Sequence, residues 1–256
     1  MTSGSYGGKV VVVTGGSSGI GAAVVGRFAR EGASVVIGYN RGAHEADYLK
    51  EELEATGTPC VAVKADVSKT RELEQLMDRA VDRFGRIDVL AACAGISHFG
   101  SLSTLTPEAV DHVFAVNTRG QLLAAQHAAE RMTAGGRIIL TSSNATRRAV
   151  FEHGLYAASK AAIDAMVRCL SVELGPRGIT INAVAPGATA TAMVANNAAR
   201  YQPPGMNLSA EEWLSVSHAL DRIATPDEVA GAYTFLAGKD AAYISGRTLP
   251  VESCVF

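Results

Sequence analysis

The sequence predicts an α/β fold, in which seven parallel strands form one doubly wound sheet with helices on both faces. Short runs of β-branched residues alternate with longer stretches that carry apolar residues at helical spacing. The first run is apolar at every position from 10 to 13, which is typical of a strand covered on both faces. Right-handed crossovers through the intervening helices make such strands parallel.

The elements follow one another in regular alternation. We predict strands at 9–13, 34–39, 60–64, 87–91, 137–141, 179–184 and 248–251, because each is a short run of mainly apolar residues. Helices are predicted near 19–31, 44–56, 70–84, 107–131, 155–174 and 226–236. Residues 188–220 interrupt the alternation with Pro203-Pro204-Gly205 and the single Trp213. A segment of this kind is typical of a substrate lid, and a surface insertion is the alternative.

Composition and charge exclude several classes of protein. The chain has 23 Lys and Arg against 25 Asp and Glu, and a net charge of −2 argues against nucleic acid or an anionic membrane as a partner. A hydrophobic content of 48% excludes a disordered chain. No linker divides the sequence, so one domain over 1–256 is expected. No apolar stretch reaches the roughly 18 residues of a membrane helix, and no signal peptide is recognisable, so a cytoplasmic location is expected.

The cysteines and histidines form no recognisable disulfide or metal pattern. Cys60, Cys93, Cys169 and Cys254 are scattered singly, with no C-x-x-C pair. None of the six histidines lies in an H-E-x-x-H helix. The sequence therefore predicts neither disulfides nor a metal site.

A glycine-rich turn follows the first predicted strand. Gly15, Gly19 and Gly21 lie at i, i+4 and i+6, where the first helix begins. Glycines here permit a tight turn, close approach of the backbone to a pyrophosphate, and close packing of helix on strand. This context predicts a dinucleotide site, although the spacing differs from G-x-G-x-x-G and a merely tight turn is the alternative. The cofactor-binding residues predicted in the turn are Gly15, Ser17, Ser18, Gly19, Ile20 and Gly21.

The end of the second predicted strand discriminates between NAD and NADP. An acidic residue there holds the ribose hydroxyls and repels a phosphate, but the sequence is Tyr39-Asn40-Arg41, with no acid and one guanidinium. NADPH is therefore favoured over NAD, and a solvated surface role for Arg41 is the alternative. Asp66, after the third strand, either accepts a hydrogen bond from the adenine amino group or caps the helix that follows.

A second group of residues indicates proton transfer. Tyr156 and Lys160 lie four apart in a predicted helix, so they share one face. Ser143 follows the fifth strand, where open parallel sheets bind their ligands. A nearby ammonium lowers the pKa of a phenol from its ordinary value near 10. The three suit carbonyl reduction: Ser143 binds the oxyanion, Tyr156 exchanges the proton, and Lys160 also binds the nicotinamide ribose. An exposed Tyr–Lys face with a capping Ser is the alternative.

These features together resemble the short-chain dehydrogenase/reductase family over essentially the whole chain. The resemblance rests on 14–21, Asp66, Asn117, Ser143, Tyr156-x-x-x-Lys160 and the run Asn182-Ala183-Val184-Ala185-Pro186-Gly187. It implies a Rossmann fold and an NADP-dependent oxidoreductase acting on CH–OH and C=O groups. It also implies that Asn117 helps to hold a water that relays protons to Lys160. The cofactor-binding residues implied beyond the glycine turn are Tyr39, Asn40, Arg41, Asp66, Val67, Ala94, Gly95, Tyr156, Lys160, Pro186, Gly187, Thr189 and Thr191.

One departure from the family concerns the fourth strand. The usual Asn-Asn-Ala-Gly is here Ala92-Cys93-Ala94-Gly95, so the strand support that the second Asn provides must come from elsewhere. Cys93 is either a reactive thiol or, in the favoured interpretation, a buried cysteine that packs as a small hydrophobe.

Several stretches are similar to fungal polyhydroxynaphthalene reductases and anthrol reductases: 116–121, 136–140, His153, 193–201 and 207–212. This resemblance implies that Met193 and Tyr201 face a flat aromatic substrate, and packing of the lid is the alternative. It also brings the C-terminal Phe256 to the pocket of its own or a neighbouring subunit. The predicted substrate-binding residues are Ser143, His153, Tyr156, Met193, Tyr201 and Phe256.

The resulting prediction is an NADPH-dependent reductase of a hydroxylated aromatic or other cyclic polyketide-type ketone, acting in secondary metabolism with Tyr156 as acid and base. A 3-oxoacyl-thioester reductase is one alternative, with Arg119, Arg147 and Arg148 as candidates for a basic patch that meets an acyl carrier. The others are another secondary-alcohol dehydrogenase and a non-catalytic NADP-binding regulator. The family resemblance implies a homo-oligomer, a dimer or a homotetramer, in which the helices near 107–131 and 155–174 pair.

Overall fold

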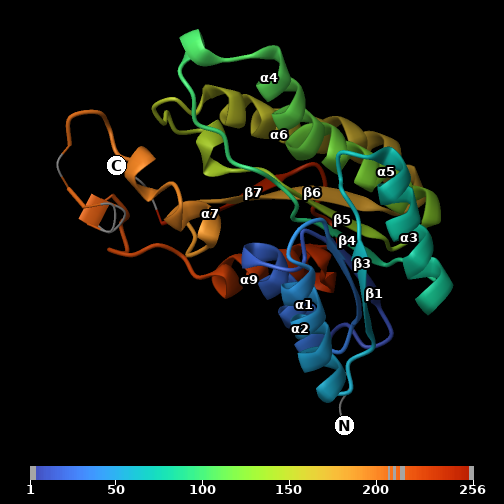
Figure 1. Cartoon of the computed structure of the whole chain (residues 1–256). Coiled ribbons are helices and arrows are strands. Elements are labelled where there is room, and N and C mark those ends of the chain that lie inside the picture. The colour runs from blue at the N-terminus through green and yellow to red at the C-terminus, as the bar shows by residue number, and fades with distance from the viewer. Residues whose placement is uncertain (1–3, 207, 210–211, 214–216, 254–256) are drawn as a thin grey trace.

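A sheet of seven strands forms the centre of the molecule (Figure 1). The computed structural model describes residues 4–206, 208–209, 212–213 and 217–253. Every neighbouring pair of strands is parallel, in the order β3-β2-β1-β4-β5-β6-β7. The strands are β1 (Val10–Thr14), β2 (Ser34–Tyr39), β3 (Cys60–Lys64), β4 (Val89–Ala92), β5 (Arg137–Thr141), β6 (Thr180–Pro186) and β7 (Thr248–Val251). The predicted sheet is confirmed, and the doubly wound arrangement is that of a Rossmann fold.

Helices cover both faces of the sheet. α3, α5 and α6 pack on one face, whereas α1, α2 and α9 pack on the other (Figure 1). The α-helices are α1 (Gly19–Arg30), α2 (Ala43–Ala55), α3 (Thr70–Phe84), α4 (Pro107–Phe114), α5 (Gly120–Arg131), α6 (Gly154–Leu174), α7 (Ala192–Ala195) and α9 (Pro226–Ala237). Short 3-10 turns are η1 (Leu102–Thr104), η3 (Asn144–Thr146), η4 (Gly175–Arg177), η5 (Ala198–Arg200) and η6 (Lys239–Ala241). Among the described residues, none of these helices has both the length and the apolar character to cross a membrane.

The helix predicted at 107–131 is not one continuous α-helix. A π-helix, η2 (Ala115–Arg119), separates α4 from α5. Its central residue is Asn117, whose side-chain amide donates to the Ile96 carbonyl (2.9 Å) and accepts from the Ile96 N–H (2.8 Å). A π-turn of this kind is frequent at functional sites, and it leaves the apolar spacing on either side unchanged. The hydrophobic periodicity therefore could not predict it.

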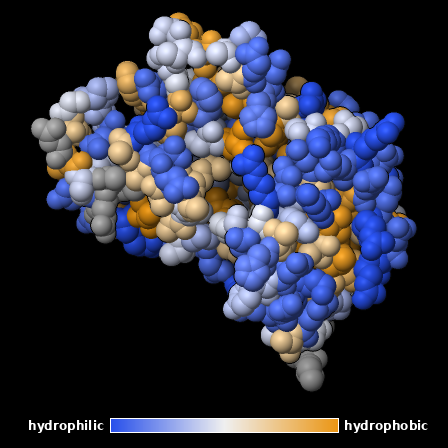
Figure 2. All heavy atoms as spheres, viewed as in Figure 1, coloured by the Kyte–Doolittle hydropathy of each residue, from blue (hydrophilic) through white to orange (hydrophobic). Residues whose placement is uncertain are grey.

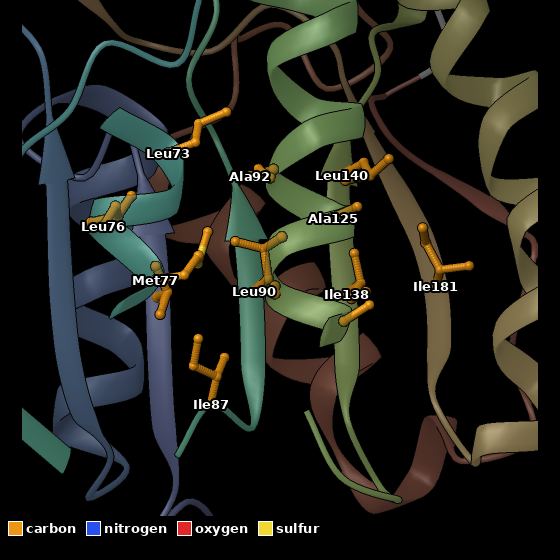
Figure 3. Close-up of a cluster of buried hydrophobic side chains, with 14 of the residues drawn as sticks. Leu73, Leu76, Met77, Ile87, Leu90, Ala92, Ala125, Ile138, Leu140 and Ile181 are labelled. Carbon is orange, nitrogen blue, oxygen red and sulfur yellow. The ribbon is translucent and has the colours of Figure 1, made fainter. Parts of the chain in front are cut away.

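The alternation of side chains along β1 builds two cores at once. Val12 packs in the cluster between the sheet and α3, α5 and α6, whereas Val11 and Val13 pack in the cluster between the sheet and α1 and α9. All three are fully buried. Figure 3 shows side chains of the first cluster, among them Leu73, Leu76, Met77, Leu90, Ile138, Leu140 and Ile181. Each fully buried Leu or Ile contributes about 1.5–3 kcal/mol to folding, so the sheet is a stable platform for its loops.

The strand order places the functional loops. The chain winds from β1 through β2 to β3 on one side and then returns to place β4 on the other side of β1. In open parallel sheets, ligands bind beyond the carboxyl ends of the strands where the order reverses. The glycine turn after β1 and the loops after β4, β5 and β6 all lie at this end, because parallel strands end at the same edge of the sheet.

Candidate active site

A pocket opens beyond the carboxyl ends of β4, β5 and β6. It has roughly 920 Å³ of space, part of it open to solvent. Figure 2 shows a hollow near the middle of this face of the molecule, where hydrophobic and hydrophilic side chains meet. The predicted site residues in its wall are Ile20, Gly95, Ser143, His153, Tyr156, Lys160, Pro186, Gly187, Thr189, Thr191, Met193 and Tyr201. Residues from the loops after β4, β5 and β6 and from α1, α6 and α7 thus line one cavity.

The glycine turn has the geometry that its sequence predicts. Gly15 and Gly19 have positive φ of 65° and 53°, which side chains with a Cβ rarely adopt. A Cβ on Gly21 would stand 2.0 Å from the Gly15 carbonyl oxygen, so only glycine fits there. A Cβ on Gly19 would come within 3.2 Å of Thr191 Cγ2. The turn therefore faces the segment after β6, and the two predicted halves of a dinucleotide site lie together.

The predicted NADP-specificity residues lie at the outer end of the glycine turn. The Ser17 hydroxyl donates to the Arg41 carbonyl over 3.3 Å, and Gly42 turns the chain with a φ of 75°. Tyr39 is half-buried, whereas Asn40 and Arg41 are exposed. The Arg41 guanidinium makes no hydrogen bond or ion pair with any residue that the structure describes. Ser17 and Arg41 thus lie side by side just after β2, where Arg41 is predicted to bind the phosphate of NADP.

Asp66 does not cap the following helix. Its Oδ1 accepts from the Ser68 N–H (2.9 Å) and the Ser68 hydroxyl (2.7 Å), and the N-cap position of α3 is occupied by Lys69. Burial raises the pKa of Asp66, but the two bonds from Ser68 outweigh it and hold that pKa below its ordinary value. Val67 beside it is buried. The capping interpretation is therefore wrong, and a carboxylate is held at the end of β3.

Tyr156, Lys160 and Ser143 converge at the inner end of the pocket. Tyr156 and Lys160 lie on the first two turns of α6, with the Lys160 Nζ 5.9 Å from the centre of the Tyr156 ring. The Lys160 ammonium donates to the Thr141 carbonyl over 2.9 Å. Ser143 is the N-cap residue of η3, and its Oγ accepts from the Ala145 N–H (3.2 Å), so the capping role that the alternative gave Ser143 is present. Both Ser143 and Lys160 are buried, so an exposed Tyr–Lys face is excluded.

The electrostatics of Tyr156 differ from the prediction. Burial raises the pKa of Tyr156 to about 12, and its interaction with the Ser143 hydroxyl offsets only part of that rise. Burial also lowers the pKa of Lys160 to about 8. The expected lowering of the phenol's pKa by the ammonium is therefore wrong for this site, because the loss of water around the phenol dominates. At neutral pH the phenol keeps its proton.

A comparison of sequences identifies the family. The profile of the family described as enoyl-(acyl carrier protein) reductase matches residues 15–253. A short-chain dehydrogenase from Burkholderia cenocepacia, solved in complex with NADP, is 37% identical and has a TM-score of 0.88 over 98% of each chain. The chain belongs to the short-chain dehydrogenase/reductase family.

Two fungal members of this family are similar over almost their full length. Versicolorin reductase 1 of Dothistroma septosporum is 41% identical over 256 residues, which cover 97% of this chain and 96% of that protein. A probable tetrahydroxynaphthalene reductase of Zymoseptoria tritici is 37% identical over 249 residues, which cover 96% of this chain and 93% of that protein. The resemblance inferred from the motifs is thereby confirmed.

In this short-chain dehydrogenase/reductase, Thr141 joins the elements around Cys93, where the sequence departs from the family's Asn. The Thr141 hydroxyl donates to the Ala92 carbonyl (2.6 Å) and accepts from the Tyr233 hydroxyl (2.6 Å), so it ties β4, β5 and α9 together. Sequence reasoning missed Thr141 and Tyr233, which lie 92 residues apart. Cys93 is partly buried and lines the pocket, and desolvation raises the pKa of its thiol to about 12, which favours a packed thiol over a reactive thiolate.

The aromatic cluster that we call the outer wall consists of His153 and Tyr201, which line the pocket of this reductase-family chain, and Phe99, which packs against both rings. The His153 ring stacks between Phe99 (4.1 Å between ring centres) and Tyr156 (4.4 Å), and Tyr201 meets Phe99 edge-on at 5.1 Å. The Trp213 indole N–H donates to the Tyr201 carbonyl (3.0 Å). The predicted Met193 is 37% exposed beside this wall, and Phe256 lies outside the described residues. Phe99 was not predicted, because no sequence pattern links it to His153.

His153 is a neutral base within that wall. Its Nδ1–H donates to the His98 carbonyl over 2.8 Å, which leaves Nε2 as a hydrogen-bond acceptor. Burial lowers the pKa of His153 to about 4. The outer wall therefore presents aromatic faces and an acceptor, without a charge from this residue.

The three arginines considered for a carrier-binding patch do not lie together. Arg148 lines the pocket, and Arg147 is exposed next to it in the chain. Arg119 instead donates to the Ser68 carbonyl (3.0 Å) beside the loop before α3. Of these three candidates, Arg148 thus lines the pocket and the other two do not.

Proposed function

We propose that the protein is an NADPH-dependent reductase of a ketone on a hydroxylated aromatic or cyclic polyketide-type substrate. The observation that carries this proposal is the convergence of Ser143, Tyr156 and Lys160 at the inner end of a pocket whose outer wall is aromatic. Versicolorin reductase and tetrahydroxynaphthalene reductase, both similar over nearly their full length, support the class of substrate. The proposed substrate wall consists of His153, Met193 and Tyr201.

The cofactor assignment rests on the fit of these residues to a dinucleotide. The cradle of Gly15, Gly19 and Gly21 leaves no room for a Cβ at Gly21 and suits a pyrophosphate. The hydroxyl of Ser17 and the guanidinium of Arg41 suit the phosphate of NADP, and the Burkholderia relative binds NADP. We assign the binding of the nicotinamide end to Pro186, Gly187, Thr189 and Thr191. We assign the binding of the adenosine end to Asp66, Val67, Ala94, Gly95, Tyr39 and Asn40. The bound cofactor supplies the hydride.

The chain's own residues supply the proton and hold the carbonyl. Ser143 donates its hydroxyl proton to a hydrogen bond with the carbonyl oxygen, on which negative charge develops. Tyr156 then donates its phenolic proton to that oxygen, and the raised pKa keeps this proton in place at pH 7 until it is needed. Lys160 uses one N–H on Thr141 and has two further donors for the nicotinamide ribose. Asn117 orders the loop after β4, and we assign it the water that returns protons towards Lys160.

The test is oxidation of NADPH and of NADH by the purified enzyme with four ketones: a hydroxytetralone, a hydroxyanthraquinone reduced in situ, an acetoacetyl thioester and a sugar. We expect turnover of the bicyclic or tricyclic ketones with NADPH, and Tyr156→Phe should reduce kcat by about 10²-fold or more, with little change in the Kd for NADPH. Preference for the thioester would instead establish a carrier-dependent reductase. Tight NADPH binding without turnover of any ketone would indicate a non-catalytic regulator.

We also propose that the chain forms a homo-oligomer, a dimer or a tetramer, in the cytoplasm. Support for association comes from α6, where Ala158 and Ala161 are exposed and Val172 is 76% exposed, so a second helix could approach closely. Support for a reducing compartment comes from the described cysteines, Cys60, Cys93 and Cys169, which are free thiols. Light scattering after size-exclusion chromatography measures the oligomeric state, and a monomer at micromolar concentration would contradict the first part.

A further inference from the structure

One arginine lies in the wall of the pocket itself. Arg148 follows Ser143 by five positions, and its backbone N–H donates to the Asn144 carbonyl over 3.1 Å, which closes the short turn after β5. The turn places Arg148 in the same cavity as Ser143, Tyr156 and His153. Arg148 is half-buried, whereas its neighbour Arg147 is exposed.

The charge of Arg148 has no partner among the described residues. Arg27, Arg131 and Arg222 bind carboxylates directly, and Arg177 donates to backbone carbonyls. By contrast, the Arg148 guanidinium makes no side-chain hydrogen bond or ion pair within the part of the chain that the structure describes. Burial lowers the pKa of Arg148, and only the carboxylate of Glu252 acts in the opposite direction, from beyond ion-pair distance. A partly desolvated cation without a carboxylate at ion-pair distance is costly, so a ligand anion in direct contact with Arg148 would be stabilised there.

The surroundings define which end of a substrate would meet this cation. Lys160, the other cation of the pocket, is buried and donates to Thr141 at the inner end. The aromatic wall carries no charge, because His153 is neutral and Tyr156 and Tyr201 keep their protons at pH 7. Arg148 is therefore the one described cation of the wall that is open to an anionic group on a substrate whose ketone lies at Ser143 and Tyr156.

We propose that Arg148 is a specificity-determining residue that binds an anionic oxygen group of the substrate, either a carboxylate or an ionised phenol or enol. This inference rests on the carbonyl-reductase function proposed above. A guanidinium presents a planar fork of N–H donors that matches a pair of oxygens, as in a carboxylate or a neighbouring phenolate and carbonyl. The same contact orients a flat ring system that the aromatic wall alone would hold in several orientations.

The test compares a tetralone carrying a carboxylate, its methyl ester, and a tetralone carrying an acidic phenol. The enzymes are the unmodified protein, Arg148→Gln, Arg148→Lys and the matched control Arg147→Gln.

In the unmodified enzyme we expect kcat/KM for at least one charged ketone to exceed that for the ester by about tenfold or more. Arg148→Gln should remove this preference through KM, with kcat for the ester and the Kd for NADPH changed less than about twofold. Arg148→Lys should restore part of the preference, since an ammonium keeps the charge but not the fork. Arg147→Gln should behave as the unmodified enzyme.

The charged ketone whose kcat/KM advantage over the ester is lost in Arg148→Gln identifies the anionic group as a carboxylate or a phenolate. If Arg148→Gln lowers kcat/KM equally for the charged ketones and the ester, the inference is overturned. Weakened NADPH binding by this variant would also overturn it, because the guanidinium would then belong to the cofactor site. Turnover by the unmodified enzyme without preference for charge would also overturn it, while leaving the ketone reductase in place. Titration of the NADP-loaded protein with 2-naphthoate and its methyl ester measures anion binding independently of ketone turnover. Arg148-dependent binding of the acid without turnover of any ketone would reject the proposed function but retain the anion site.

Discussion

At the scale of single residues, burial decides the chemistry of the site more than neighbouring charge does. Tyr156 has an ammonium on the next turn of its helix, yet its pKa rises to about 12, because water is excluded from the phenol. The same exclusion lowers the pKa of Lys160 to about 8 and that of His153 to about 4. A protonated phenol suits proton donation in reduction, whereas oxidation of an alcohol requires the phenolate.

We predict that the Arg41 side chain determines the preference for NADPH over NADH. Arg41→Ser should raise the Kd for NADPH by roughly 10–100-fold, because a hydrogen bond to a charged group contributes about 1.5–3 kcal/mol, and it should leave the Kd for NADH unchanged. Fluorescence titration with both cofactors measures this. Arg79→Ser, an exposed arginine on α3, is the control. Equal weakening of both cofactors would show that Arg41 supports the loop rather than the phosphate.

His153 predicts a pH dependence of stability. Its pKa is about 4 in the folded protein and 6.5 without burial, so the unfolded chain binds the proton more readily. The stability that depends on neutral His153 is fully present above about pH 6.5 and is lost as the pH falls towards 4, by up to about 3 kcal/mol. Denaturant unfolding at several pH values measures it. In His153→Gln this component of the slope should disappear, and an unchanged slope would contradict the assignment.

At the scale of elements, the junction of β1 and α1 shows how local geometry builds a binding site. Helix α1 can start directly at the proposed pyrophosphate site because Gly21 on its first turn lies against the Gly15 carbonyl. The π-helix η2 is a second such device, since it presents the Asn117 amide to both backbone groups of Ile96 and so connects the loop after β4 to the helices.

The close approach at Gly21 can be tested with alanine. Gly21→Ala places a Cβ 2.0 Å from the Gly15 carbonyl oxygen, so the turn must move. We expect the Kd for NADPH to rise by about tenfold or more and stability to fall by about 1–3 kcal/mol. Gly26→Ala in the same helix is the control, because its Cβ meets only the Arg30 side chain at 3.4 Å. That change should add about 0.5–1 kcal/mol of stability. Normal NADPH binding by Gly21→Ala would refute the steric argument.

At the scale of the whole molecule, two apolar layers hold the sheet that carries every loop of the site. Leu90 lies in β4, the strand next to the reversal of strand order, and is fully buried against α3 and α5. Its neighbours come from elements spread over most of the chain (Figure 3). A defect here therefore affects the fold and the site together.

Leu90→Ala should lower the free energy of unfolding by about 2–5 kcal/mol, because it removes buried methyl groups and leaves a cavity. Leu102→Ala, at a side chain 89% exposed, should change it by less than about 0.5 kcal/mol. Chemical denaturation of both variants measures the difference. A loss below 1 kcal/mol for Leu90→Ala would mean that the layer repacks around the gap.

The sequence by itself determined the features that depend on near neighbours in the chain. The strands, the glycine turn at Gly15–Gly21 and the shared face of Tyr156 and Lys160 follow from periodicity and spacing, which are local properties. The parallel arrangement of the strands followed from a general rule of handedness, and it places Ser143 at the same end of the sheet as the turn.

Only the tertiary structure decided which distant side chains meet and how much water they keep. Thr141 and Tyr233 form a hydrogen bond, and Phe99 packs against His153 and Tyr201. Arg148 lines the pocket, whereas Arg119 contacts Ser68. These contacts join residues far apart in the chain, and no local pattern encodes the loop conformations that make them. The shifted pKa values have the same origin, because desolvation is set by every element that packs around a group.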